Sequence, residues 1–354
     1  MGLNTILHYP PREPLAVLPS PFHLLSRASE RWGQGRRIWC KRDDLTGSLL
    51  TGNKVRKLEF LAAEAFNSGC TVLVTAGALQ SNHCRATAAV AAQLGLKCEL
   101  ILRGEEQELS GNYLLSKMLN AEITYVCRRT TGEEMTVHLA ESERRWASKG
   151  EKALTIPIGG SDAMGIWGYI LAVEELMADM AENALTKVAI VHATGSGGTQ
   201  AGLNAGVLLH GASADVISYA VCDDESYFNA KAQEDWENLR AYRSELPNEP
   251  IKTITNDKYI GPGYGRAGDE IFDTLAELAR LEGITLDPVY TGKAFQGLIT
   301  DLSQNAFPSE ASDIIFMHTG GVFGIFPHAS AVQAALGRGS TADQATIDKG
   351  QDDA

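Results

Sequence analysis

The sequence has 354 residues, 44% of them hydrophobic, and its formal net charge is −13. The length suits about two domains, and the composition is that of a globular protein with a substantial core. The acidic balance argues against a general nucleic-acid binder, and no run approaches the roughly 18 apolar residues that a membrane span needs.

The cysteines are scattered and form no CxxC pair, so the sequence predicts neither a zinc site nor a disulfide framework. Thiols of this kind are typical of a reducing compartment. The N-terminus lacks the basic and apolar regions of a signal peptide. We therefore expect a cytoplasmic protein that binds no metal, no membrane and no nucleic acid.

In chain order, a proline-rich start is followed by apolar runs that alternate with helical patterns. The runs expected to form strands are Ile38–Asp44, Thr71–Ala76, Lys97–Leu102, Ile123–Val126, Ala153–Pro157, Val188–Ala193, Val216–Val221 and Ile314–His318. The expected helices are Leu24–Trp32, one from Lys54 onward, Asn82–Leu94, Gly111–Leu119, Glu133–Ser148, Ile166–Met180, Gln200–Leu209, Tyr227–Ser244, Asp269–Glu282 and Lys293–Asn305. This alternation predicts an α/β fold whose parallel sheets are covered by helices on both faces.

One lysine stands out because of its position in a predicted helix. Lys54, Leu58, Leu61 and Ala65 recur at helical spacing, so they share one face. Since three of the four are apolar, the face packs inward and carries Lys54 toward the interior. Burial disfavours a charged amine, which lowers its pKa and makes the lysine a usable nucleophile. The alternative is a lysine whose amine reaches solvent from the helix end.

Two of the expected strand-to-helix turns have the character of anion sites. One holds Ser81, Asn82 and His83, where Ser81 or Asn82 suits a helix N-cap and the free amides suit a carboxylate. The other, Val191–Gly202, is glycine-rich, so its amides and the helix dipole suit a phosphate. It is not a Walker loop, because Leu203 stands where lysine is required. Each turn could equally be a cap or a tight connection without a ligand.

A third turn, Met317–Val322, also follows an expected strand, and Tyr264 and Tyr290 lie in glycine-containing loops upstream of it. Open α/β sheets bind ligands outside the carboxyl ends of their strands, where all three turns lie. Either tyrosine could instead be a packing residue. A lysine of buried type, a phosphate cradle and a carboxylate site together suit pyridoxal phosphate, whose aldehyde bonds a lysine and whose substrates are amino acids.

Five motifs resemble those of the D-cysteine desulfhydrase and 1-aminocyclopropane-1-carboxylate deaminase family, which belongs to the tryptophan-synthase-β-like, fold type II pyridoxal phosphate enzymes. The match covers nearly the whole chain. The motifs are Lys41–Gly47, Gly52–Glu59, Thr75–His83, Thr194–Thr199 and His318–Gly321. The resemblance implies two open, twisted, mostly parallel sheets with helices on both faces, and a homodimer.

The resemblance also implies a division into two domains. Residues 1–49 and 164–338 are expected to form a large cofactor-binding domain. Residues 50–163 are expected to form a small inserted domain that closes over the substrate, and residues 339–354 a polar tail.

For the cofactor, the resemblance implies that Lys54 bonds the aldehyde covalently and that Asn53 hydrogen-bonds the phenolic oxygen. Tyr290 is expected to lie against the pyridine ring, and Thr319 to contact the cofactor. The phosphate is expected to be held by Lys57, Thr194, Gly195, Ser196, Gly197, Gly198 and Thr199.

For the substrate, the resemblance implies that Ser81, Asn82 and His83 take the carboxylate, with Ser81 also a carrier of protons. Tyr264 is expected near the reacting atoms, and Thr291 beside the substrate. The catalytic residues implied in this way are Lys54, Ser81, Tyr264 and Tyr290.

Thr291 and Thr319 bear on the type of reaction. Deaminases of the family resemble one another in a glutamate at the first position and a leucine at the second, whereas desulfhydrases have small hydroxyl residues at both. A hydroxyl supports the electron sink of the cofactor only weakly, which suffices when a good leaving group departs from Cβ. The two threonines therefore favour α,β-elimination, with D-cysteine giving pyruvate, hydrogen sulfide and ammonia.

Other functions remain open. An L-cysteate sulfo-lyase of the same family releases sulfite, and Arg56, Arg85 or Lys293 could meet the sulfonate group. A 1-aminocyclopropane-1-carboxylate deaminase is a further alternative. Two hypotheses belong to other classes, namely a non-catalytic protein that binds pyridoxal phosphate and a doubly wound nucleotide-binding protein.

Overall fold

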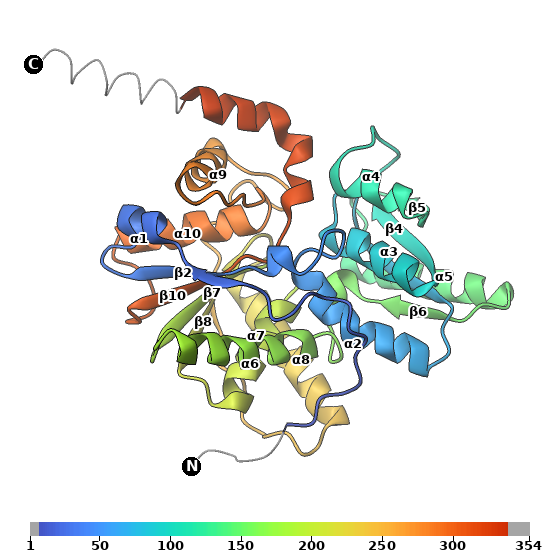
Figure 1. Ribbon diagram of the computed structural model, residues 1–354. Helices are drawn as coiled ribbons and strands as arrows, with labels where there is room; N and C mark the ends of the chain where they lie inside the picture. The colour runs from blue at the N-terminus through green and yellow to red at the C-terminus, as the bar shows by residue number, and fades with distance from the viewer. Residues whose placement is uncertain (1–6, 339–354) are drawn as a thin grey trace, which may run out of the picture.

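The computed structural model describes residues 7–338, which form two separate β-sheets (Figure 1). The larger sheet has the strand order β1-β2-β10-β7-β8-β9, and the smaller one has the order β5-β4-β3-β6. Neighbouring strands are parallel except β1 and β2. Helices cover both faces of each sheet, so the predicted α/β fold with two mostly parallel sheets is confirmed.

The bounds of the strands are β1 Phe22–Leu24, β2 Arg37–Lys41, β3 Val72–Ala78, β4 Lys97–Arg103, β5 Glu122–Val126, β6 Ala153–Ile156, β7 Val188–Thr194, β8 Ala214–Ala220, β9 Ile254–Asn256 and β10 Asp313–Met317. The bounds of the helices are α1 Ser26–Trp32, α2 Asn53–Asn67, α3 Asn82–Leu94, α4 Gly111–Met118, α5 Gly132–Ser148, α6 Trp167–Glu182, α7 Gly198–His210, α8 Glu225–Tyr242, α9 Asp269–Glu282 and α10 Thr291–Ser303. Short 3₁₀ turns occur at Asp43–Leu45, Ile158–Gly160, Val322–Gly324 and Phe326–His328.

Most of the expected elements lie within a few residues of their predicted bounds, but β1 and β9 were not expected. Each has three residues and lies at an edge of the larger sheet, so neither carries a periodic signal of its own. β1 occupies the position where the first helix was expected to begin, and α1 therefore starts at Ser26. α7 starts at Gly198 rather than Gln200, which places its first turn inside the glycine-rich loop.

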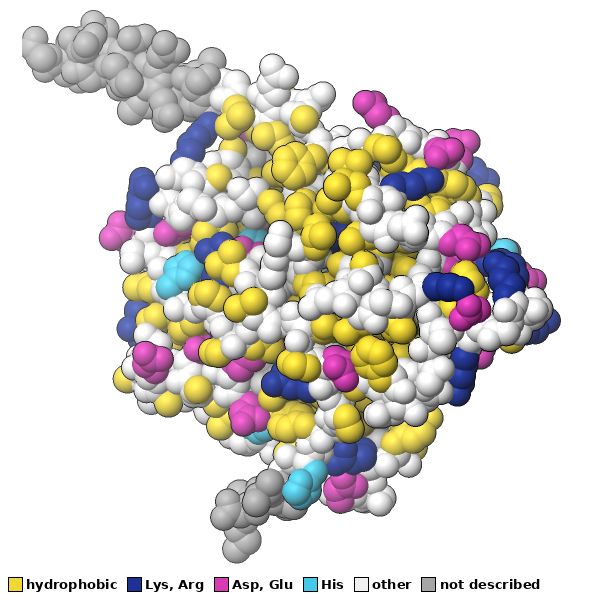
Figure 2. Space-filling view, turned by 45° about the vertical axis from the view of Figure 1, so that its right-hand side comes forward, with side chains coloured by type: hydrophobic (Ala, Val, Ile, Leu, Met, Phe, Trp, Pro, Cys, Tyr) yellow, Lys and Arg dark blue, Asp and Glu magenta, His cyan; other side chains and the backbone are white. Residues whose placement is uncertain are grey.

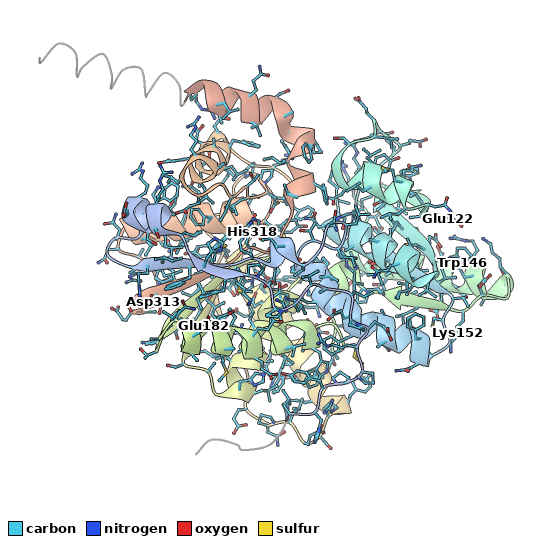
Figure 3. The ribbon with its side chains drawn as sticks, viewed as in Figure 1. Glu122, Trp146, Lys152, Glu182, Asp313 and His318 are labelled. Carbon is cyan, nitrogen blue, oxygen red and sulfur yellow. The ribbon has the colours of Figure 1, made fainter. Side chains whose placement is uncertain are left out.

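Two hydrophobic layers enclose the larger sheet. On one face Ile314 and Phe316 of β10 pack with α9 and α10, and on the other Ile315 and Met317 pack with α6. This alternation is the period of two that a strand covered on both sides requires. Figure 3 shows His318, which follows β10, near the middle of the molecule, with Asp313 toward its edge. The carboxyl ends of the large-sheet strands therefore point toward the smaller sheet.

Helix α2 lies between the two sheets and is buried on nearly every side (Figure 1). Leu58, Leu61 and Ala65 are buried as the helical spacing predicted, but Arg56 and Glu59 on the opposite face are buried as well. The reason is that α2 packs against α6 of the large-sheet layer and against α3 of the small-sheet layer. A helix covered on both sides has no solvent face, so the one-sided amphipathic pattern understates its burial.

A buried ion cluster anchors the first turn of α2. Arg56 donates to both oxygens of Asp43, at 2.8 and 2.9 Å, and to both oxygens of Glu175, at 2.8 and 3.0 Å. Tyr169 and Ser20 donate to the same Asp43 carboxylate. Because a buried charge without partners costs several kcal/mol, this cluster fixes the helix start that carries Lys54.

The strands of the smaller sheet all lie between Val72 and Ile156, within the predicted small domain, although the domain bounds themselves remain a prediction. The predicted polar tail, residues 339–354, lies outside the described residues. Figure 2 shows acidic and basic side chains interspersed over one face. Within residues 7–338, no helix is both long and apolar enough to cross a membrane. The homodimer remains a prediction.

Candidate active site

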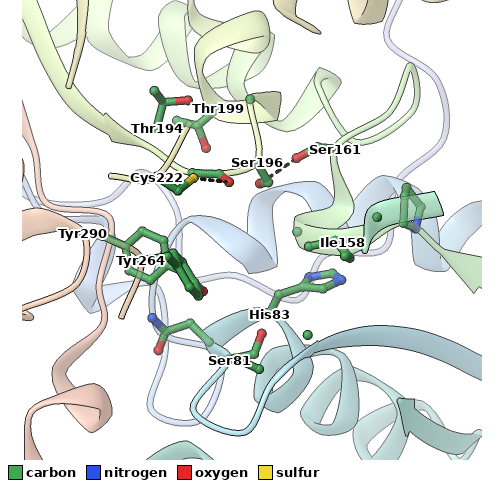
Figure 4. Close-up of a pocket in the computed structure, with 18 of the residues that line it drawn as sticks. Ser81, His83, Ile158, Ser161, Thr194, Ser196, Thr199, Cys222, Tyr264 and Tyr290 are labelled. Atoms are coloured by element: carbon green, nitrogen blue, oxygen red, sulfur yellow. Dashed lines mark hydrogen bonds between the residues drawn. The ribbon is translucent and has the colours of Figure 1, made fainter. Parts of the chain in front are cut away.

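A cavity of about 910 Å³ lies between the two sheets, where the carboxyl ends of β3, β7 and β10 approach the first turn of α2. Figure 4 shows Ser81 and His83 on one side of it and Thr194, Ser196 and Thr199 on the opposite side. Both sheets therefore contribute to one site. The predicted site residues that line the cavity are Asn53, Lys54, Ser81, Asn82, His83, Thr194, Gly195, Ser196, Gly197, Thr199, Tyr264, Tyr290 and Thr319.

Lys54 lies in the first turn of α2 and faces this cavity. The turn follows Gly52, whose φ of +99° favours glycine and where a Cβ atom would lie 2.6 Å from the carbonyl oxygen of Thr319. The Lys54 amine makes no hydrogen bond to any residue between positions 7 and 338. Burial within the protein lowers the pKa of Lys54 to about 8. A substantial fraction of the amine is therefore neutral and nucleophilic near neutral pH.

Lys57 lies in the same helix, but it is fully buried, whereas Lys54 is partly exposed to the cavity. The Lys57 amine donates to the carbonyl of Gly159 at 3.2 Å and to Ser161 Oγ at 3.1 Å. Burial and the neighbouring Lys54 hold the pKa of Lys57 well below its usual value. Since it lies behind the cavity wall, Lys57 suits an electrostatic role rather than attack on a ligand.

The glycine-rich loop ends at the first turn of α7. Gly197 is the N-cap, with a φ of +83° and no side chain to occupy the helix start. A Cβ atom at Gly198 would lie 2.7 Å from Lys57 Nζ and 2.6 Å from Ser161 Oγ, so glycine is required there. Thr194 Oγ1 is buried without a hydrogen-bond partner among residues 7–338. Free amides, a cation and an unpaired hydroxyl suit a bound phosphate.

Ser161 belongs to this cradle although it was not predicted from the sequence. Its Oγ accepts hydrogen bonds from Lys57 Nζ and from the amide of Gly198, both at 3.1 Å, and donates to Ser196 Oγ at 2.9 Å. It follows the turn Gly159-Gly160, in which both glycines have a positive φ. This glycine pair was the sequence signal that could have indicated a special turn at this position. Only the tertiary structure brings this turn to the start of α7.

On the small-sheet side, Ser81 is the N-cap of α3, and its Oγ accepts the amide of Cys84 at 3.2 Å. Asn82 accepts from Asn112 Nδ2 at 2.9 Å. His83 Nε2 bonds Thr75 Oγ1 at 2.9 Å, while its Nδ1 is buried without a described partner. Burial, with Lys54 and Lys57 nearby, holds the pKa of His83 well below its usual value, so the ring is neutral. These residues can bind a carboxylate through neutral donors.

Tyr264 and Tyr290 meet over the cavity, with their hydroxyls hydrogen-bonded and their rings edge to face at 5.9 Å (Figure 4). The Tyr290 ring also covers Gly195, where a Cβ atom would lie 3.0 Å from the ring edge. Burial raises the pKa of Tyr264 to about 12 and that of Tyr290 well above its usual value. Both hydroxyls therefore keep their protons at neutral pH; one proton makes the bond between the two hydroxyls, and the other can be donated to a ligand.

Thr291 is fully buried and does not line the cavity, although Thr319 does. The Thr291 hydroxyl donates to Asp287 Oδ1 at 2.8 Å, and Asp287 also accepts the amides of Val289, Tyr290 and Thr291. Asp287 lines the cavity and caps the start of α10, a role that sequence reasoning missed. The signal was the Asp-Pro pair shortly before the helix, which favours a turn.

The three cations considered for a sulfonate group do not line the cavity. Arg56 is paired with Asp43 and Glu175, and Arg85 donates to Asn112 and to two backbone carbonyls. Lys293 also donates to backbone carbonyls. Besides Lys54, the lysines and arginines that line the cavity are Arg103 and Lys231.

Comparison with known proteins gives a consistent result. The family model described as "Pyridoxal-phosphate dependent enzyme" matches residues 14–320. A Thermotoga maritima protein named "Putative 1-aminocyclopropane-1-carboxylate deaminase" is 42% identical over 316 residues, which are 88% of this chain and 96% of the relative. The Arabidopsis thaliana protein named "Bifunctional D-cysteine desulfhydrase/1-aminocyclopropane-1-carboxylate deaminase, mitochondrial" is 37% identical over 93% of this chain and 82% of its own length.

Solved structures agree. An "ACC deaminase homologue" has a TM-score of 0.82 and 35% identity, with 92% of this chain and 96% of that chain covered. An L-serine ammonia-lyase from Rhizomucor miehei has a TM-score of 0.65 at 15% identity over 92% of this chain and 99% of that chain, which shows the fold alone. The unpaired Thr194 hydroxyl, the open glycine loop and the free Lys54 amine fit the phosphate and the aldehyde of pyridoxal phosphate. The chain therefore belongs to the pyridoxal-phosphate dependent enzymes, within the D-cysteine desulfhydrase and 1-aminocyclopropane-1-carboxylate deaminase family.

Proposed function

We propose that this enzyme catalyses α,β-elimination on a small amino acid, with D-cysteine as the preferred substrate and pyruvate, hydrogen sulfide and ammonia as products. The observation that carries pyridoxal phosphate chemistry is the unpaired Lys54 amine, with a pKa of about 8, in a cavity between two helix N-termini. The choice of elimination rests on the fully engaged Asp287 carboxylate. The name of the Arabidopsis thaliana relative includes D-cysteine desulfhydrase activity.

The residues that would hold the cofactor come mainly from α2 and α7. Lys54 would bond the aldehyde, and the first turn of α7 with Lys57 and Ser161 would hold the phosphate. Asn53 Nδ2 donates to Thr199 Oγ1 at 3.0 Å, which fixes the amide that is expected to face the phenolic oxygen. When bound, the cofactor supplies a ring that withdraws electrons from the Cα of the substrate.

The residues that would orient the substrate come from the start of α3. A carboxylate at Ser81 and Asn82 would meet the positive end of the helix dipole and the neutral His83 ring. The Lys54 amine, with a pKa of about 8, is balanced between accepting and donating a proton, which suits removal of the proton on Cα. Ser81 is the second candidate for this proton transfer, because it lines the same cavity.

The tyrosine pair suits departure of the leaving group. Tyr264 and Tyr290 stay protonated at neutral pH and face the cavity. A hydroxyl donor beside a departing sulfur atom stabilises the negative charge that develops on it. The pair would therefore assist loss of sulfide from Cβ.

The choice of elimination is supported by the surroundings of Asp287, which lines the cavity. Asp287 lies against Gly321, where a Cβ atom would be 2.7 Å from its carboxyl carbon. Both of its oxygens are already engaged, one with the Thr291 amide and hydroxyl and the other with two backbone amides. A carboxylate with its acceptors engaged supports a ring nitrogen only weakly, and a weak electron sink suits a substrate with a good leaving group.

Ring opening of 1-aminocyclopropane-1-carboxylate is the second candidate, and a specific observation favours it. The name of the Thermotoga maritima relative, 42% identical to this chain, is that of a putative deaminase for this compound. Both reactions need the lysine, the phosphate cradle and the carboxylate site, so these features do not separate them.

A substrate panel tests the proposal. The purified enzyme would be incubated with D-cysteine, L-cysteine, L-cysteate, β-chloro-D-alanine and 1-aminocyclopropane-1-carboxylate, with assays for pyruvate, 2-oxobutyrate, sulfide and sulfite. We expect pyruvate and sulfide from D-cysteine at the highest kcat/KM. A higher kcat/KM for 2-oxobutyrate formation would establish the second candidate, and sulfite from L-cysteate would establish a sulfo-lyase. Absence of every product from an enzyme with bound cofactor would indicate a non-catalytic carrier.

A further inference from the structure

The loop that carries Tyr264 has little packing of its own. Gly261, Gly263 and Gly265 have φ angles of +65°, +112° and +73°, and a Cβ atom at any of them would meet nothing within 4 Å. The Tyr264 side chain is 44% exposed as a whole, although its hydroxyl is buried against that of Tyr290. Glycines with open surroundings give a backbone many accessible conformations, so a specific contact must hold this loop if the Tyr264 hydroxyl is to have one position.

Lys293 supplies such a contact. It lies in the first turn of α10 with its side chain buried, and its amine donates to the carbonyl of Ile260 at 2.7 Å and to that of Gly263 at 2.8 Å. These carbonyls lie on either side of Gly261 and Pro262. Within residues 7–338, no carboxylate lies within 4 Å of the amine, so the cation is committed to the loop backbone.

The same helix start also fixes the other tyrosine. Tyr290 is the N-cap residue of α10, and its amide donates to Asp287 Oδ2 at 2.9 Å. Lys293 follows three residues later. One helix terminus therefore determines the position of Tyr290 through its backbone and that of Tyr264 through the Lys293 amine.

We propose that Lys293 is a positioning residue for the elimination reaction: its ammonium group clamps the loop 260–263 so that the Tyr264 hydroxyl meets that of Tyr290 over the cavity. The proposal rests on the proposed function for its effect on turnover, but the clamping itself is independent of the chemistry. Lys293 touches neither substrate nor cofactor in this assignment, since it does not line the cavity.

The test compares Lys293→Met with Lys293→Arg, and uses Lys258→Met as the matched control. Lys258 is an exposed lysine in the same segment whose side chain makes no hydrogen bond to residues 7–338. Hydrogen exchange of peptides spanning residues 257–266 would be measured by mass spectrometry on the full-length holoenzyme. We expect at least tenfold faster exchange in Lys293→Met, a smaller change in Lys293→Arg, and none in Lys258→Met. Unchanged exchange in a folded Lys293→Met enzyme would overturn the clamp.

Kinetics then test the link to Tyr264. We expect Lys293→Met and Tyr264→Phe each to lower kcat about 10- to 100-fold, with no further loss in the double variant, because both changes remove the same hydroxyl contact. If the loss of kcat in the double variant equals the product of the losses in the two single variants, the positioning role is overturned. If Lys293→Met does not fold, Lys293→Gln, which keeps an N–H donor group but loses the charge, should show an intermediate loss of kcat. Absence of elimination in the wild-type enzyme, together with the expected exchange result, would refute the proposed function and leave the clamp intact.

Discussion

Two helices of equal length begin at the cavity, α3 from the small-sheet layer and α7 from the large-sheet layer, and their first turns differ. The N-cap of α3 is Ser81, whose hydroxyl already accepts a backbone amide. The N-cap of α7 is Gly197, which has no side chain, and Gly195 and Gly198 lie in the same loop. A helix start that is capped by its own side chain suits a ligand that binds and dissociates in each turnover, such as a substrate. A helix start without a side-chain cap has free amides, which only a permanently bound anion satisfies.

Lys54 lies between these two helix starts, and its removal should have the largest effect. We expect Lys54→Ala to lower turnover at least about 10⁴-fold, the scale seen when an enzyme loses its covalent nucleophile. The cofactor should no longer be fixed by borohydride reduction, as measured by mass spectrometry of tryptic peptides. Lys57→Ala is the matched control, which should weaken phosphate binding but retain the covalent link. A borohydride-reducible link that survives in Lys54→Ala would show that a different lysine bonds the cofactor.

Gly197→Asp should break the uncapped helix start. The added carboxylate would occupy the place of a phosphate, so we expect the dissociation constant of the cofactor to rise at least about 100-fold, equivalent to about 3 kcal/mol. Equilibrium dialysis followed by absorbance measures the retained cofactor. Gly211→Asp is the control, because Gly211 ends the same helix with a φ of +63° and open space around it. Equal retention in the two variants would refute the phosphate assignment.

Ser81→Ala should separate substrate binding from cofactor binding. Loss of the hydroxyl at the α3 start should raise KM for D-cysteine about 10- to 100-fold, the effect of one hydrogen bond to a charged group. The lost cap should also lower the free energy of unfolding by about 1 kcal/mol. Asp224→Ala is the control: it removes the N-cap of α8 at a residue that does not itself line the cavity, and it should leave KM for D-cysteine unchanged. A normal KM in Ser81→Ala would show that the carboxylate binds elsewhere.

The smallest expected effect is a pH dependence of cofactor loading. The pKa of Lys54 is about 8, so at a pH below this value most of the amine is protonated and cannot attack an aldehyde. The rate of cofactor loading should therefore rise with pH and level off above pH 8. Between pH 7 and pH 9 the neutral fraction rises about tenfold. Stopped-flow absorbance after mixing apoenzyme with pyridoxal phosphate measures the rate, with a lysine peptide as reference. A rate that is still rising steeply above pH 9 would show an ordinary, unshifted amine.

Local sequence signals determined a large part of this fold. The alternation of apolar runs and helical patterns gave the α/β class, and α3 and α9 begin and end at their predicted residues. These signals are local, because a helix cap and a hydrophobic period are read within a few turns of the chain. The motifs around Lys54 and the two helix starts likewise named residues that the structure brings to one cavity.

Only the tertiary structure decided which side chains reach that cavity. Thr291 follows Tyr290 directly, yet it points into the interior toward Asp287. Ser161 joins the phosphate cradle from 104 residues beyond Lys57. The edge strands β1 and β9 exist because a neighbouring strand offers them backbone partners. Contacts between distant segments depend on how whole layers of helices and strands pack. A short stretch of sequence contains no information about that packing.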